Sequence, residues 1–215
     1  MSLLLQEAYT TIETKRQEIM KRLVILLVVL ATSANVMFSQ YSLTYEENNY
    51  GDFYSAISNE TVEDIKFNDP EMYLNRGMEL AQNHDLFKAI SAFSEAIDLN
   101  EEYALAYDKR GIAHTKVMNY HRALKDFNRA IKIDPEFAEA YNHRGIVNYC
   151  LRNYVQSIND YTRAITLDPE YGKAYYNRAI TRLMIDDEKG AYQDLQKALE
   201  YNFKEAEEVI KEFFE

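Results

Sequence analysis

The stretch YNHRGI, Tyr141 to Ile146, carries a glycine inside a run whose apolar spacing predicts a helix. A glycine in a helix interior costs about 1 kcal/mol relative to alanine. The same arrangement occurs three more times, as YLNRGM at 73–78, YDKRGI at 107–112 and YYNRAI at 175–180. A cost that recurs in this way indicates a packing requirement that recurs with it.

Aligned on the tyrosine, the four copies repeat every 34 residues without a gap. Units 104–137 and 138–171 share 15 of 34 residues, so the repeat extends over the whole unit. The repeated columns are aromatic, small, small, aromatic and small. Their members are Tyr73, Tyr107, Tyr141 and Tyr175; Gly77, Gly111, Gly145 and Ala179; Ala89, Ala123, Ser157 and Ala191; Phe93, Phe127, Tyr161 and Leu195; and Ala96, Ala130, Ala164 and Ala198.

Each unit is predicted to contain two amphipathic helices. The first surrounds the tyrosine, and a short break follows at NHD, MNY, RNY or IDD. The second helix ends near Asp-Pro in two units, because proline cannot continue a helix. Two helices in 34 residues, with small residues at fixed crossing points, resemble the tetratricopeptide repeat. The resemblance implies an all-α fold, an α-solenoid of about four helix-turn-helix units with a C-terminal capping helix.

The four expected units lie at 70–103, 104–137, 138–171 and 172–203. The capping helix is expected at 204–215. The fourth unit departs most from the others, with Ala179 in the glycine column and Phe203 in place of proline. Such divergence is typical of a terminal repeat, which has a neighbour on one side only.

Three columns are predicted to be structural, because a feature that recurs from unit to unit describes the scaffold. Glycine where the two helices of a unit cross removes a Cβ and lets the helices approach. Arginine precedes it at Arg76, Arg110, Arg144 and Arg178, and aspartate recurs on the second helix at Asp126, Asp160 and Asp194, with Ala92 in the first unit. We expect each arginine to pair with an aspartate of its own or the preceding unit.

An export signal precedes the repeats. In MKRLVILLVVLATSANVMFSQ, residues 20–40, two bases precede an apolar run and small residues follow it, which is the order of a signal peptide. We expect residues 1–39 to be that signal, cleaved after Ala34 or Ser39. The alternative is an uncleaved membrane anchor running to Phe38. In both cases the bases before the run place the body outside the cytosol, in the periplasm or secreted.

Residues 40–69 are acidic and rich in tyrosine and asparagine, and we expect them to be a linker. Met20 is a second candidate start of the chain. Cys150 is the one cysteine, so an intramolecular disulfide is excluded. The formal net charge of −11 disfavours nucleic acid as a partner, because the acidic body repels phosphate.

No motif of an enzyme, cofactor or metal site is present in the sequence. The four histidines, at 84, 114, 121 and 143, have no i, i+4 spacing of a helical metal site. Metalloprotease, phosphate-loop, nucleophile-elbow and dinucleotide motifs are absent. Cys150 and His143 share one helix but lack a third group to orient them. We therefore expect no catalytic residue, no cofactor and no metal, and an enzyme with an unrecognised site is a minor alternative.

The resemblance places a binding surface on the first helices, which in this family line a concave groove that holds segments of other proteins. Helical spacing from each tyrosine gives the expected partner-binding residues: Leu74, Asn75, Met78, Asp108, Lys109, Ile112, Asn142, His143, Ile146, Tyr149, Lys173, Tyr176, Asn177 and Ile180. The apolar members would hold side chains of the partner and the amides its backbone. An equally open interpretation is that part of this row packs neighbouring first helices together.

The sequence thus predicts an exported, non-enzymatic scaffold that binds a protein or peptide partner in the groove. The alternative is a membrane-anchored assembly subunit that docks through its convex face or through the C-terminal helix, with Phe213 and Phe214. One subgroup of the family binds the acidic tail of cytosolic chaperones with lysines and asparagines. Of the positions that correspond here, only Lys173 suits that clamp, so we do not expect it. The oligomeric state stays open.

Overall fold

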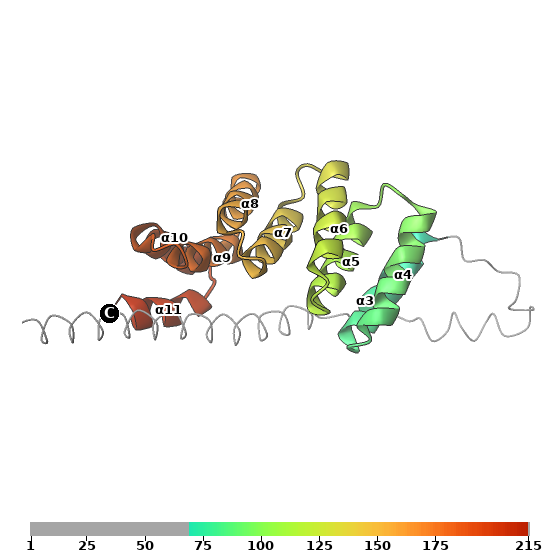
Figure 1. Ribbon diagram of the computed structural model, residues 1–215, viewed down its shortest axis with the longest axis horizontal. Helices are drawn as coiled ribbons and strands as arrows, with labels where there is room; N and C mark the ends of the chain where they lie inside the picture. The colour runs from blue at the N-terminus through green and yellow to red at the C-terminus, as the bar shows by residue number, and fades with distance from the viewer. Residues whose placement is uncertain (1–68, 215) are drawn as a thin grey trace, which may run out of the picture.

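The computed structural model describes residues 69–214, and each described segment is a helix or a turn between helices (Figure 1). The expected signal peptide and the linker up to residue 68 lie outside the described residues. The helices are α3 Pro70–Gln82, α4 Leu86–Leu99, α5 Ala104–Lys116, α6 Tyr120–Ile133, α7 Ala138–Cys150, α8 Tyr154–Leu167, α9 Gly172–Leu183, α10 Glu188–Glu200 and α11 Glu205–Phe213. They form four helix-turn-helix pairs followed by a single helix, so the expected all-α solenoid is confirmed.

The break inside each unit is a left-handed residue at the end of the first helix. The four positions have φ near +60° and lie one repeat apart: His84, Met118, Arg152 and Asp186 at 62°, 58°, 61° and 62°. This is the place where helices usually carry glycine. A non-glycine residue there costs about 1 kcal/mol or more. The left-handed residue reverses the chain tightly enough for the second helix to pack antiparallel on the first.

The turns between units are closed by an Asn or Asp side chain. Asn100, Asp134 and Asp168 each accept a hydrogen bond through Oδ1 from the backbone amide two residues on, at 3.0, 2.9 and 3.1 Å. This local bond fixes a turn in which the helix stops. The first unit lacks the proline that follows the aspartate in the next two units. It ends in the same turn because Asn100 makes the same hydrogen bond.

The repeated glycine makes room for an aromatic ring of the second helix. A Cβ added at Gly77, Gly111 or Gly145 would lie 2.5, 2.7 or 2.6 Å from the ring of Phe93, Phe127 or Tyr161. These rings are almost fully buried, so they cannot move aside cheaply. The sequence suggested close approach of two helices, and the structure shows that a ring fills the space. In the fourth unit Ala179 and Leu195 occupy these two columns, and both are buried in one cluster.

The predicted arginine–aspartate pairs are present in three units. Arg110, Arg144 and Arg178 donate to Asp126, Asp160 and Asp194 of their own units at 2.8, 2.6 and 2.7 Å. Each arginine also reaches the second helix of the preceding unit through Nη1, bonding Ser94, Asn128 and Thr162 at 3.0, 2.7 and 3.0 Å. The carboxylate thus comes from the same unit and an uncharged acceptor from the one before. One guanidinium therefore links three helices.

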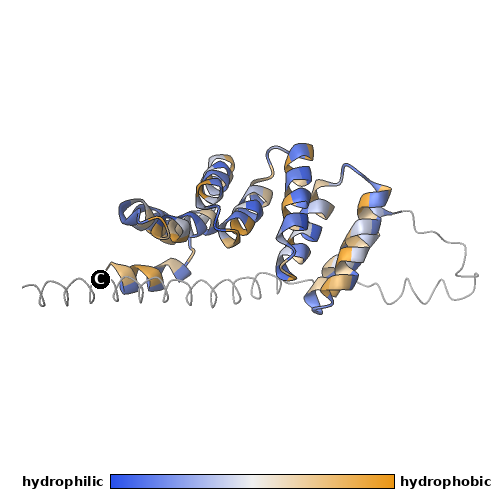
Figure 2. Cartoon of the chain, viewed as in Figure 1, coloured by the Kyte–Doolittle hydropathy of each residue, from blue (hydrophilic) through white to orange (hydrophobic). Residues whose placement is uncertain are grey.

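The end of the solenoid is covered by α11. Ala206 and Val209 are buried, and they share a cluster with α9 and α10. Hydrophobic and hydrophilic residues alternate along α11, as expected for a helix with one buried face (Figure 2). Within residues 69–214, no helix has the length and apolar character needed to cross a bilayer.

Candidate protein-binding face

The first helices form one continuous side of the solenoid, which we call the inner face. α3 contacts α5, α5 contacts α7 and α7 contacts α9, whereas successive second helices touch weakly at most. Elements that pack more closely lie on the inside of a curve. The side chains that α3, α5, α7 and α9 turn away from the second helices are therefore the residues that a partner would meet.

Nine of the predicted partner-binding residues are partly exposed on these helices. They are Asn75, Met78, Lys109, Ile112, His143, Ile146, Tyr149, Lys173 and Asn177. Among them, apolar side chains at Met78, Ile112 and Ile146 recur at one position of successive units. Polar groups recur three residues earlier, as Asn75, Lys109, His143 and Asn177. The inner face therefore presents an apolar row beside a polar row.

The other five predicted residues are buried, and for them the prediction of direct partner contact is wrong. They are Leu74, Asp108, Asn142, Tyr176 and Ile180, each 5% exposed or less. The physical reason is that the position after the tyrosine faces the first helix of the next unit and is covered by it. In the fourth unit, where no further repeat follows, Tyr176 packs on Phe203 at 4.9 Å between ring centroids, and Ile180 lies in the cluster closed by α11.

One buried residue carries a charge that the neighbouring unit compensates. Asp108 is completely buried, and its Oδ1 lies 2.7 Å from Nδ1 of His143 on the next first helix. Lys109 Nζ lies 3.6 Å from the other carboxylate oxygen. Burial acts to raise the pKa of Asp108, but His143 and Lys109 outweigh it and hold that pKa below the usual range for a carboxyl group. The three residues form a charged link between units two and three.

The same geometry recurs one unit further without charge. Asn177 Nδ2 donates to Asn142 Oδ1 at 2.9 Å, across α9 and α7. The Nδ2 group of Asn142, Oδ2 of Asp108 and the hydroxyl of Tyr149 have no hydrogen-bond partner within the described part of the chain. In the polar row, His143 and Asn177 are thus held by hydrogen bonds to the buried side chains of Asp108 and Asn142.

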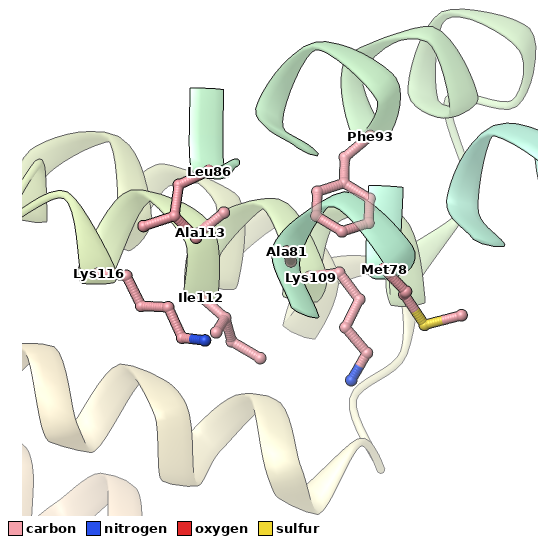
Figure 3. Close-up of a pocket in the computed structure, with 8 residues that line it drawn as sticks. All are labelled: Met78, Ala81, Leu86, Phe93, Lys109, Ile112, Ala113 and Lys116. Carbon is pink, nitrogen blue, oxygen red and sulfur yellow. The ribbon is translucent and has the colours of Figure 1, made fainter. Parts of the chain in front are cut away.

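A small recess opens between the first two units. Its apolar lining includes Leu86, Phe93, Ala113, Met78 and Ile112. The ammonium groups of Lys109 and Lys116 extend to the same side as Ile112 (Figure 3). The predicted set did not include Lys116, although it lies two helical turns after Lys109 on the same face. Leu86 was also missed, because it belongs to the second helix α4.

At the other end of the inner face, the base at Lys173 is shielded. Burial lowers the pKa of Lys173 to about 8, and Glu205 on α11 opposes that shift. Phe213 and Phe214 pack against the cluster formed by α9, α10 and α11, and the Phe214 ring lies 5.0 Å from that of Tyr192. Phe213 and Phe214 therefore already pack against other residues of the chain.

The remaining chemistry of the described residues is modest. Cys150 is surface-exposed as a residue, yet burial of the thiol beside the Tyr120 hydroxyl raises its pKa. Its described partner is therefore Tyr120 and not His143, which pairs with Asp108. Within residues 69–214, no group of three or more potential metal ligands comes together.

The repeats match known family models. A TPR repeat model matches residues 119–151, and a Tetratricopeptide repeat model matches residues 138–171. With four such helix pairs in the structure, the family follows. The chain is a tetratricopeptide-repeat protein. No curated protein matches its sequence.

Solved structures share the fold of this tetratricopeptide-repeat protein. A MamA fragment of Desulfovibrio magneticus RS-1 is 26% identical, with a TM-score of 0.58 over 64% of this chain and 77% of that one. A Pseudomonas aeruginosa pilF structure is 18% identical, with a TM-score of 0.61 over 66% and 68% of the two chains. The first repeat domain of Spaghetti (RPAP3), bound to an HSP90 peptide, is 18% identical, with a TM-score of 0.54 over 55% and 94%. The fold is that of a protein–protein interaction scaffold.

Proposed function

We propose that this chain is an exported, non-enzymatic scaffold that binds an extended segment of a protein partner along its inner face. The observation that carries the proposal is the pair of rows on the first helices. The apolar row is partly exposed and so can accept side chains, and the polar row beside it can bond a backbone. Their members are Met78, Ile112 and Ile146, with Asn75, Lys109, His143 and Asn177.

The chemistry of the recess favours a partner segment with an acidic group next to an apolar side chain. The apolar side chain would enter between Met78 and Ile112, and the acid would meet Lys109 and Lys116 at its rim. On α5 the one carboxylate is Asp108, which is buried and lies between His143 and Lys109. A local excess of bases on a protein with net charge −11 selects for an acidic segment through complementary charge.

Export rests on the sequence and is tested separately. N-terminal sequencing of the chain recovered from the cell envelope and the secreted fraction would show a start after Ala34 or Ser39. An intact N-terminus in the membrane fraction would support the anchored alternative. Recovery in the cytosol with an intact N-terminus would contradict both.

Binding at the inner face is tested by site-specific photo-crosslinking in the cells that produce the chain. A photoreactive amino acid at Ile146 is expected to capture a protein partner. The same amino acid at Asn159, an exposed position of α8 on the outer side, is the matched control and should capture none. The double substitution Ile112→Glu and Ile146→Glu should abolish capture by a probe at Met78 while circular dichroism shows an intact fold. Capture from Asn159 alone would contradict the proposal.

The assembly-subunit alternative is tested on α11 by substitution. Deleting residues 204–215 would remove Ala206 and Val209 from the core and so disturb the fourth unit itself. Reversing two exposed charges, Glu208→Lys and Glu212→Lys, leaves the buried face intact. If that variant loses its partner while the Ile112→Glu and Ile146→Glu variant keeps it, the docking surface is α11 and not the inner face.

A further inference from the structure

The two edges of the solenoid differ in charge. The turns inside units lie at one edge, here called the turn edge, and the turns between units lie at the opposite one, the linker edge. Figure 1 shows the α4–α5 and α6–α7 connections on the side opposite to the end where α3 meets α4. The linker edge holds eight carboxylates and no lysine or arginine in residues 98–103, 134–139 and 168–171: Asp98, Glu101, Glu102, Asp134, Glu136, Glu139, Asp168 and Glu170.

The turn edge of units one to three has the opposite character. Between residues 109 and 125 the sequence has no acid at all, and residues 150–156 have none either. Arg122, Lys125 and Arg152 are exposed there and form no ion pair within residues 69–214. In the first unit Asp85 is paired with Lys88 at 2.7 Å, and Glu79 is exposed in the last turn of α3. The turn edge is therefore a basic strip along units two and three of an acidic protein.

The same edge carries the most exposed large apolar side chains of the described chain. Phe87, Met118 and Val155 are 77%, 74% and 63% exposed, one in each of the first three units. Each lies in the break inside its unit or directly after it, at the first turn of the second helix. On the linker edge the large exposed apolar residue is Leu99, at 38%. An exposed apolar side chain in each of three successive units gives this edge a repeated apolar contact for a surface that covers it.

Exposed apolar side chains with bases in excess over acids match the interface of an anionic bilayer. Bases are drawn to anionic headgroups and apolar tips enter the boundary of the acyl chains. An acidic protein surface with apolar side chains would offer similar chemistry, and discs that contain lipid and no other protein distinguish the two. The acidic linker edge would be repelled by the same membrane, so the charge difference between edges would orient the solenoid.

We propose that the turn edge of units one to three is a docking surface for an anionic lipid bilayer. Its apolar contacts are Phe87, Met118 and Val155, and its bases are Arg122, Lys125 and Arg152. The surface ends at the fourth unit, whose turn carries Asp186, Asp187 and Glu188.

Hydrogen–deuterium exchange of the full chain in lipid nanodiscs tests the proposal. Discs of phosphatidylcholine with phosphatidylglycerol are compared with discs of phosphatidylcholine alone. We expect slower exchange in residues 83–90, 115–125 and 150–157 on the anionic discs only. The N-terminal segment carries bases of its own at residues 15, 16, 21 and 22, so the substitutions at the turn edge, which leave that segment unchanged, separate its contribution from that of the edge. Each base near an anionic surface contributes roughly fivefold in affinity, so the variant Arg122→Gln with Lys125→Gln should weaken the contact roughly twenty-fivefold.

Matched variants test whether the effect belongs to the turn edge or follows from removing any base or any exposed apolar side chain. Lys132→Gln with Lys204→Gln removes two exposed bases away from the turn edge and should leave protection unchanged. Phe87→Ser with Met118→Ser should reduce protection on anionic discs, whereas Ile185→Ser in the fourth unit should not. Each variant is accepted only if its thermal unfolding matches the parent.

Three results would overturn the proposal. Equal protection on neutral and anionic discs would show that charge has no part in it. Protection that survives Arg122→Gln with Lys125→Gln would show that this edge is not the contact. Protection of the same turns in detergent without lipid, rising with protein concentration, would show that a second copy covers the edge instead.

Discussion

Replacing Gly111 by alanine should destabilise the chain although alanine is the better helix former. A Cβ at this position would lie 2.7 Å from Cε1 of Phe127 and 2.9 Å from its Cζ, and Phe127 is 1% exposed. Overpacking of this kind costs about 1–3 kcal/mol, and the gain in helix propensity is about 1 kcal/mol. We therefore expect Gly111→Ala to lower the free energy of unfolding by about 1 kcal/mol.

The fourth unit indicates how the loss can be reversed. There alanine stands in the glycine column and leucine in the aromatic column, as Ala179 and Leu195. Phe127→Leu alone should cost about 1–2 kcal/mol, because it leaves space beside Gly111. Together with Gly111→Ala it should cost less than the sum of the two changes by about 1–3 kcal/mol, because the new methyl group fills that space.

The assay is urea unfolding followed by far-ultraviolet circular dichroism, for the two single variants and the double variant. Ala179→Gly is the matched control. No aromatic ring faces this position, so the variant should lose about 1–2 kcal/mol, from helix propensity and from the loss of a buried methyl group. Effects that add within about 0.5 kcal/mol, or a Gly111→Ala variant more stable than the parent, would refute the argument that the ring requires glycine.

Further predictions concern the ion pairs and the thiol. Asp160→Ala leaves the Arg144 guanidinium without its carboxylate and should lower the free energy of unfolding by about 2–3 kcal/mol. The control is Arg76→Ala, in the unit that lacks the aspartate, which should change the free energy of unfolding by less than about 0.5 kcal/mol. Because the pKa of Asp108 is lowered by folding, its stabilisation is present above the ordinary value of 3.8 and is lost as the pH falls through the folded-state pKa. The drop in urea midpoint from about pH 6 to about pH 3 should then be smaller in Asp108→Asn, and an equal drop would contradict the assignment. Since the pKa of the Cys150 thiol is raised, iodoacetamide should modify it more slowly at about pH 7 than it modifies a cysteine in an unfolded peptide, and rates that are equal would contradict the shielding.

Features internal to one unit could be predicted from the sequence. The 34-residue period sets two helices per unit, and the arginine and aspartate columns, 16 residues apart, come together wherever those helices pair. The exposed residues of the inner face were harder to predict from the sequence. Neighbouring helical positions differ by about 100° in direction, so a shift of one residue changes which side chain faces outward. Asp108 and Lys109 are adjacent, yet the first is fully buried by the next unit and the second is partly exposed.

The sequence by itself determined the all-α class, the repeat and the ladder of arginine–aspartate pairs, because these depend on contacts that each unit makes with itself and its nearest copy. Only the tertiary structure decided which inner residues are covered, and it alone placed Phe87, Met118 and Val155 along one edge with the exposed bases. The angle at which units stack determines both which inner residues are covered and which side chains share an edge. That angle follows from side-chain contacts between units, such as the hydrogen bond from Asn177 on α9 to Asn142 on α7, and no single helix pattern contains it.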